Sequence, residues 1–154
     1  MIIRYNEIVL ARTLDFLKQS GFRHMECVVL WLGKKSGNSI DITNVYRPAH
    51  KAAMDYFHIP RESMNDLTRF LRENRLVIGA QVHSHPSEAF HSQADDKWAV
   101  IRHMGAISIV IPDFALHTTP HNFMDHAATF SLNPNNRWIK LSNSEVRSTC
   151  LQTN

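Results

Sequence analysis

The chain has 154 residues, of which 44% are hydrophobic, and this is the size and composition of a single domain that can bury a core. The net charge is only +3, and the lysines and arginines are scattered along the chain, so nucleic acid is not indicated as a partner. No run approaches the roughly 20 apolar residues of a membrane span, the N-terminus lacks the plan of a signal peptide, and two isolated cysteines fit a reducing compartment, so we expect a cytoplasmic protein.

Strand and helix patterns alternate along the first half of the chain. In chain order they predict a short strand over 2–5, a helix over 7–20 capped by Asn6 and stopped by Gly21, a strand over 26–33, a turn over 33–38, a strand over 39–45 and a helix over 60–74. The segment 47–59 is less regular, and we expect it to lie over a substrate groove.

The second half continues this alternation. Residues 76–82 are apolar and β-branched and predict a buried strand, and a helix is expected over 93–104 because Ala94, Trp98, Ile101 and Met104 share one helical face. Further strands are predicted over 106–112, 114–118 and 127–132, followed by a polar, partly disordered tail over 142–154. The fold class is therefore α/β, with one domain over 1–141 in which a mixed β-sheet is flanked by helices.

Two histidines and an aspartate form a candidate metal site. His83 and His85 follow the strand 76–82, and side chains two apart in a strand point to the same face. Ser92 is the expected N-cap of the next helix, so the carboxylate of Asp95 lies in its first turn and can reach the strand end. Catalytic zinc keeps three protein ligands and one water, whereas structural zinc is closed by four. We therefore predict one catalytic Zn²⁺ held by His83, His85 and Asp95.

The best candidate for a general base is Glu26. The run after this glutamate is almost wholly apolar and predicts a buried strand, so a carboxylate at its start needs a polar partner. A water molecule activated by zinc would be such a partner, since the reaction needs a group that takes its proton and returns it to the leaving group.

In this order, Glu26, then His83-Ser84-His85-Pro86, then Ser92-x-x-Asp95 resembles the signature of the JAMM metalloproteases, also called MPN+ or JAB. The resemblance spans roughly residues 26–112 and implies a single MPN-type domain. It further implies a zinc isopeptidase that removes ubiquitin-like proteins from lysines or trims their C-termini. By the same resemblance Ser92 helps to hold the oxyanion.

The spacing departs from the commoner family pattern at one point. Six residues separate His85 from Ser92, where the family more often has seven, so a rigid count from His85 would choose Asp96 as the third ligand. We prefer Asp95, because helix capping fixes its position relative to Ser92 while the preceding loop can absorb a deletion. His91 lies in this loop, and we expect it to be solvated.

Several alternatives stay open at this stage. The substrate can instead be a sulfur-carrier-type ubiquitin-like protein, and the small size favours a bacterial-type member that works beside E1-like and E2-like proteins in a conjugation or antiphage defence system. An inactive MPN scaffold is a second alternative, although such domains usually lose the ligands. A zinc nucleoside deaminase is disfavoured, because its P-C-x-x-C element is absent from the sequence.

Overall fold

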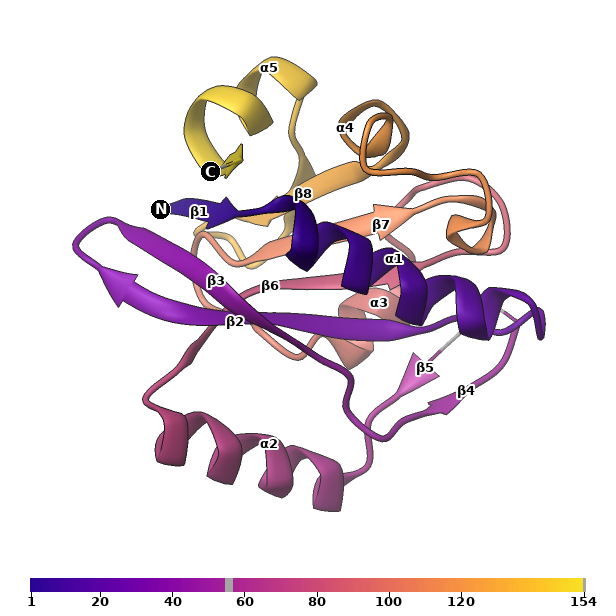
Figure 1. The fold of residues 1–154 in the computed structure, drawn as a ribbon, viewed down its shortest axis with the longest axis horizontal. Coiled ribbons are helices and arrows are strands. Elements are labelled where there is room, and N and C mark those ends of the chain that lie inside the picture. The colour runs from indigo at the N-terminus through magenta and orange to yellow at the C-terminus, as the bar shows by residue number, and fades with distance from the viewer. Residues whose placement is uncertain (55–56, 154) are drawn as a thin grey trace.

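A computed structural model describes residues 1–54 and 57–153, without the side chains of residues 149 and 150. Its centre is one mixed sheet with the strand order β10-β1-β3-β2-β6-β7-β8-β9 (Figure 1). The strands are β1 (Ile2–Tyr5), β2 (Val28–Ser36), β3 (Ser39–Tyr46), β6 (Val77–Ser84), β7 (Ile107–Ile111), β8 (Ala128–Leu132), β9 (Trp138–Lys140) and β10 (Leu151–Thr153). The pairs β1–β10, β1–β3 and β6–β7 are parallel and the others antiparallel, so the predicted mixed α/β class is confirmed.

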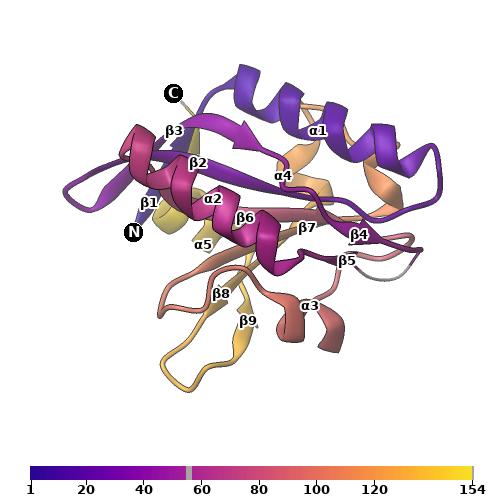
Figure 2. The ribbon, with the colours of Figure 1, turned by 90° about the horizontal axis from the view of Figure 1, so that it is seen from below.

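Helix α1 (Glu7–Gly21) covers one face of this sheet (Figure 2). Its first turn is capped by Asn6, whose side-chain oxygen accepts a hydrogen bond from the backbone N–H of Val9 at 3.0 Å. The predicted stripe of Leu10, Leu14 and Leu17 is buried against the sheet. The sequence prediction for this helix is therefore confirmed.

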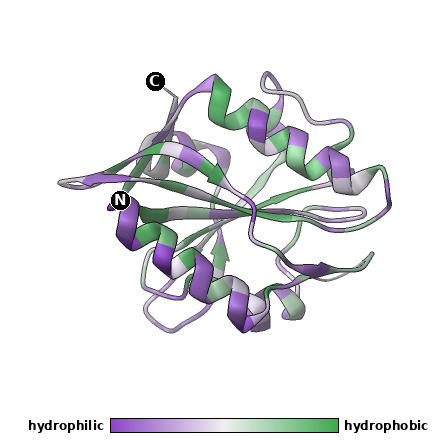
Figure 3. Ribbon diagram, turned by 60° about the horizontal axis from the view of Figure 1, so that its bottom comes forward, coloured by the Kyte–Doolittle hydropathy of each residue, from purple (hydrophilic) through white to green (hydrophobic). Residues whose placement is uncertain are grey.

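Helix α2 (Arg61–Asn74) packs on the opposite face. Leu67 is buried against Leu30 and Leu32 of β2, and further apolar side chains of the helix pack beside it, namely Met64, Phe70 and Leu71. Polar residues alternate with these along the helix (Figure 3). Because successive strand residues point to opposite faces, the residues of β6 also divide between the two sides. Ala80 and Val82 join the cluster under α1, which leaves residues 81 and 83 on the other face.

The helix predicted over 93–104 is shorter than expected, because α3 spans only Gln93–Trp98. Ala99 leaves the helical conformation at φ −55° and ψ 124°, and the backbone N–H of Val100 bonds to a side chain of β6. Met104, predicted on the buried face, is 73% exposed. The apolar spacing beyond Trp98 therefore did not reflect a helix.

The strand predicted over 114–118 is also wrong. Residues Asp113–Ala115 form a short 3₁₀ turn, and all three have left-handed backbone conformations with φ of 51°, 51° and 62°. A Cβ at Gly21, the last residue of α1, would lie 2.6 Å from both Cβ and the carbonyl oxygen of Phe114. Glycine is thus required where α1 meets this turn.

The division of the chain at residue 142 needs correction as well. Residues 142–153 form a helical turn, α5 (Asn143–Glu145), a π-helical turn over Val146–Cys150, and β10, which pairs in parallel with β1. The last three described residues of the predicted polar tail, 151–153, are therefore part of the main sheet, and Asn154 lies outside the described residues. No helix in the described part of the chain has the length and apolar character needed to cross a membrane.

The segment 47–59 contains a small two-stranded sheet of β4 (Lys51–Ala52) and β5 (Phe57–His58). Residues 55 and 56 within this segment lie outside the described residues. The remaining short helix, α4 (Phe123–His126), lies between β7 and β8 in the sequence.

Candidate metal centre

The end of β6 brings both histidines to the α2 face of the sheet. His83 and His85 are 0% and 3% exposed. The backbone of His85 continues the pairing beyond the strand, since its N–H donates to the carbonyl oxygen of Ile111 at 2.9 Å and its own carbonyl oxygen accepts from the N–H of Phe114 at 2.7 Å. The two imidazoles are therefore fixed by the backbone of a central strand.

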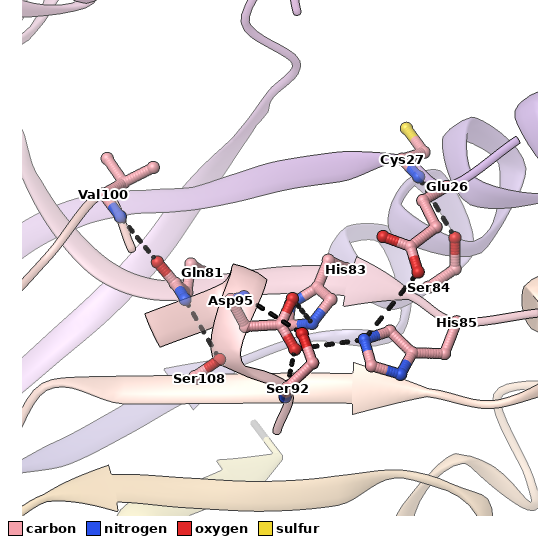
Figure 4. Close-up of polar contacts among 10 residues, drawn as sticks. All are labelled: Glu26, Cys27, Gln81, His83, Ser84, His85, Ser92, Asp95, Val100 and Ser108. Carbon is pink, nitrogen blue, oxygen red and sulfur yellow. Dashed lines mark hydrogen bonds and ion pairs between the residues drawn. The ribbon is translucent and has the colours of Figure 1, made fainter. Parts of the chain in front are cut away.

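Helix α3 brings the carboxylate of Asp95 to the same point (Figure 4). A capping box sets the start of this helix: Ser92 Oγ accepts from the N–H of Asp95 at 3.1 Å, and Asp95 Oδ2 accepts from the N–H of Ser92 at 2.7 Å. Among the residues of α3 only Asp95 is buried. The predicted cap and the predicted direction of the carboxylate are both present.

The three side chains converge on one point. Asp95 Oδ1 lies 3.1 Å from His83 Nε2, and Asp95 Oδ2 lies 3.1 Å from His85 Nε2. One ligand atom from each residue lies within 4.8 Å of the other two. Burial alone would raise the pKa of Asp95, but the charge of His83 and hydrogen bonds from His85 and from the backbone of Ser92 outweigh it and hold this pKa well below its usual range.

This donor set fits a divalent metal ion. Within the described residues no hydrogen bond reaches either ring nitrogen of His83, although Nε2 lies close to Asp95, and buried imidazole nitrogens ordinarily have a partner. A metal ion between the rings and the carboxylate would satisfy this nitrogen. Two imidazoles and one carboxylate also leave a coordination position open, as catalytic zinc sites do.

Glu26 lies beside this group, two residues before β2 begins. Its side chain is buried, and Oε1 lies 3.9 Å from His85 Nε2. The backbone N–H of Glu26 donates to the carbonyl oxygen of Ala53, just after β4, at 2.9 Å. The next N–H, that of Cys27, donates to Ser84 Oγ at 3.2 Å, so the chain around Glu26 is held against the histidine strand on one side and the small sheet on the other.

The neighbouring aspartate, Asp96, is not brought to the histidines. Its side chain is exposed, and Oδ1 accepts a hydrogen bond from Arg102 Nη1 at 2.9 Å. The helical register therefore directs Asp95 inward and Asp96 outward. This is the arrangement that the capping argument favoured over a rigid count from His85.

His91 is packed rather than solvated, contrary to expectation. Its ring stacks on that of Trp138 with centroids 4.8 Å apart, and it also lies 5.4 Å from the ring of Phe130. These three residues line a cleft of about 380 Å³ that opens beside Ser92. Sequence reasoning missed this packing because β9, which carries Trp138, was not predicted.

Comparison with known proteins agrees with the site. No protein-family model matches the chain. A probable metalloprotease of Sinorhizobium fredii is 32% identical over an alignment of 126 residues, and the match covers 79% of this chain and 76% of the relative. The chain belongs to this metalloprotease family. The present chain also shares its fold with a protein of Desulfitobacterium hafniense whose structure was determined in solution. The TM-score is 0.71, and the match covers 99% of the present chain and 93% of the Desulfitobacterium chain at 15% identity.

Proposed function

We propose that this metalloprotease is a zinc-dependent peptidase of the JAMM type. Its proposed reaction is hydrolysis of the amide bond at the C-terminus of a ubiquitin-like protein, in a conjugate with a lysine or in a precursor. The observation that carries the proposal is the convergence of His83, His85 and Asp95 with a fourth buried side chain, Glu26, whose Oε1 lies 3.9 Å from His85 Nε2. Ligands and base from three separate elements thus share one point.

Zinc is the proposed ion because two imidazoles and one carboxylate are a donor set of catalytic zinc sites. When bound, zinc supplies an electrophile that lowers the pKa of water to about 7 and polarises a carbonyl oxygen. His83, His85 and Asp95 would hold it. All three residues are at most 3% exposed, so they would hold the ion away from bulk solvent.

Glu26 has the proposed role of general base and acid. Its carboxylate takes the proton of the attacking water at Oε1 and later delivers it to the departing amine. The backbone bonds on either side of Glu26, to Ala53 and from Cys27 to Ser84, fix this carboxylate relative to the histidines. Such fixed geometry is what proton transfer in both directions requires.

Ser92 is the proposed oxyanion donor. Its Oγ accepts a hydrogen bond from the N–H of Asp95, which uses a lone pair and leaves the hydroxyl proton able to donate. A donor placed beside the metal ligands would stabilise negative charge on the carbonyl oxygen of the tetrahedral species.

The proposed substrate follows from the JAMM resemblance, together with the small sheet beside the centre. The ring of Phe57 on β5 lies 5.3 Å from that of His83, so β4 and β5 border the metal site. An extended C-terminal tail can pair with a strand edge there. Action in the cytoplasm beside E1-like and E2-like proteins of a bacterial conjugation or antiphage system belongs to the same proposal, and a sulfur-carrier-type protein is the alternative substrate.

The test is cleavage of a ubiquitin-like protein fused through its C-terminus to a fluorescent reporter, with zinc present. Asp95→Ala should abolish cleavage, and Glu26→Gln should lower kcat about 10²–10⁴-fold, the usual contribution of a general base. Asp96→Ala is the matched control and should cleave like the wild type, because its carboxylate faces Arg102. Full activity in Glu26→Gln would remove the proposed base, and loss in Asp96→Ala with retention in Asp95→Ala would overturn the ligand assignment.

A further inference from the structure

A buried polar side chain stands in the apolar centre of the sheet, close to the metal ligands. Gln81 is 0% exposed in the middle of β6, where it lies opposite Leu30 of β2 and Ser108 of β7. It is two residues before His83 and so points to the same face of the sheet. A carboxamide buried there costs about 1–3 kcal/mol unless it is hydrogen-bonded, so packing alone would favour an apolar residue.

Both ends of this carboxamide are hydrogen-bonded (Figure 4). Gln81 Nε2 donates to Ser108 Oγ on β7 at 3.1 Å, and Gln81 Oε1 accepts from the backbone N–H of Val100 at 2.9 Å. The first bond is internal to the sheet. The second connects the sheet to the chain two residues beyond the end of α3.

Helix α3 depends on such a connection. It has six residues, and helices of this length are not stable by themselves. Its N-terminal end is fixed by the capping box of Ser92 and Asp95. At its C-terminal end the ring of Trp98 lies 4.1 Å from that of His58, and the bond from Val100 to Gln81 ties the following residues to β6.

We propose that Gln81 is a positioning residue for the metal centre, acting on Asp95 through Val100 and α3. On this proposal β6 supplies two ligands from its own end and sets the place of the third through a hydrogen bond from its middle. The inference rests on the proposed function, since it treats Asp95 as a zinc ligand. It adds that the affinity for zinc depends on a side chain that touches neither the ion nor the substrate.

The experiment compares the zinc affinity of three variants, measured at 25 °C by competition with a chromophoric chelator. Gln81→Met keeps the length of the side chain and loses both hydrogen bonds. Val100→Pro removes the donor of the same bond from the other side, and the extended conformation of Ala99 suits the residue before a proline. Ser108→Ala is the matched control, because it leaves Gln81 Nε2 without its partner but keeps the bond to Val100. Urea unfolding of the metal-free proteins reports the stability of each.

Gln81→Met and Val100→Pro should each weaken zinc binding about 10–100-fold, the range found when the support of a metal ligand is removed. Ser108→Ala should lose about as much stability as Gln81→Met, yet its affinity for zinc should stay within about threefold of the wild type. The reason is that this substitution leaves the bond between Gln81 and Val100 intact. If Gln81→Met does not fold, Val100→Pro carries the comparison. Equal zinc affinity in all three variants and the wild type overturns the inference, and so does equal weakening in Ser108→Ala. A wild-type protein that binds no zinc refutes the proposed function itself.

Discussion

Replacing Ser92 by alanine separates the two roles proposed for this residue. Loss of the helix cap and loss of the oxyanion donor differ in their expected free-energy cost and in the measurement that detects them. Only one of the two bonds of the capping box uses the serine side chain, Ser92 Oγ to the N–H of Asp95 at 3.1 Å. The other joins the backbone N–H of Ser92 to Asp95 Oδ2 and survives the substitution. Loss of one cap bond should therefore lower the free energy of unfolding by about 1 kcal/mol. Loss of an oxyanion donor should lower kcat about 10²–10³-fold, or about 2.7–4 kcal/mol.

The chain contains a matched control for the cap. Ser142 forms the same capping box at α5, where its Oγ accepts from the N–H of Glu145 at 3.3 Å and the helix is exposed. Ser92→Ala and Ser142→Ala should both lose about 1 kcal/mol in urea unfolding. Only Ser92→Ala should lose kcat on the ubiquitin-like fusion at saturating zinc. A kcat within about tenfold of the wild type, worth about 1.4 kcal/mol, would show that capping accounts for the whole effect and would refute the oxyanion role.

Three further outcomes are expected. Gly33→Ala should lower the free energy of unfolding by about 1–3 kcal/mol, because a Cβ there would overlap the carbonyl oxygen of Asp41; an unchanged urea midpoint would contradict the packing. Burial lowers the pKa of His91 from 6.5 in the unfolded chain to about 4 in the fold. Between these two pH values the unfolded chain binds a proton that the folded chain does not, so the metal-free fold should lose stability as pH falls from 6.5 to about 4. His91→Phe keeps the stacking on Trp138 and should reduce this loss of stability, measured by urea unfolding across that pH range. A pH profile identical to that of the wild type would show that His91 does not cause the loss. Removal of zinc by a chelator should lower the Tm of the wild type and leave the Tm of Asp95→Asn unchanged. The reason is that zinc at 100 times its Kd stabilises a fold that binds it by about 2.7 kcal/mol.

Local patterns were sufficient to predict the two long helices and the elements that carry the candidate ligands. In α1 and α2 the apolar residues recur with the helical period, and Leu10 and Leu67 are buried as that period requires. The capping pattern of Ser92 and Asp95 likewise directs a carboxylate inward without knowledge of the rest of the fold. Both kinds of prediction depend on residues at most a few positions apart.

The failures of prediction have non-local causes. The helix after Asp95 ends early where the N–H of Val100 bonds to Gln81, nineteen positions earlier in the chain. The place of residues 151–153 depends on pairing with β1 at the other end of the sequence. The one signal that was readable and overlooked is Gln81 itself, a polar residue inside an apolar run on the same face as His83.

The contact between Gly21 and Phe114 makes the far end of α1 part of the mechanical support of the metal centre. Phe114 donates its N–H to the carbonyl oxygen of His85, so a side chain at position 21 would press on the segment that holds this candidate ligand in place. Random mutagenesis should therefore find inactivating substitutions at this helix terminus as well as around the ion. Selection for restored activity should return compensating changes in the 113–115 turn.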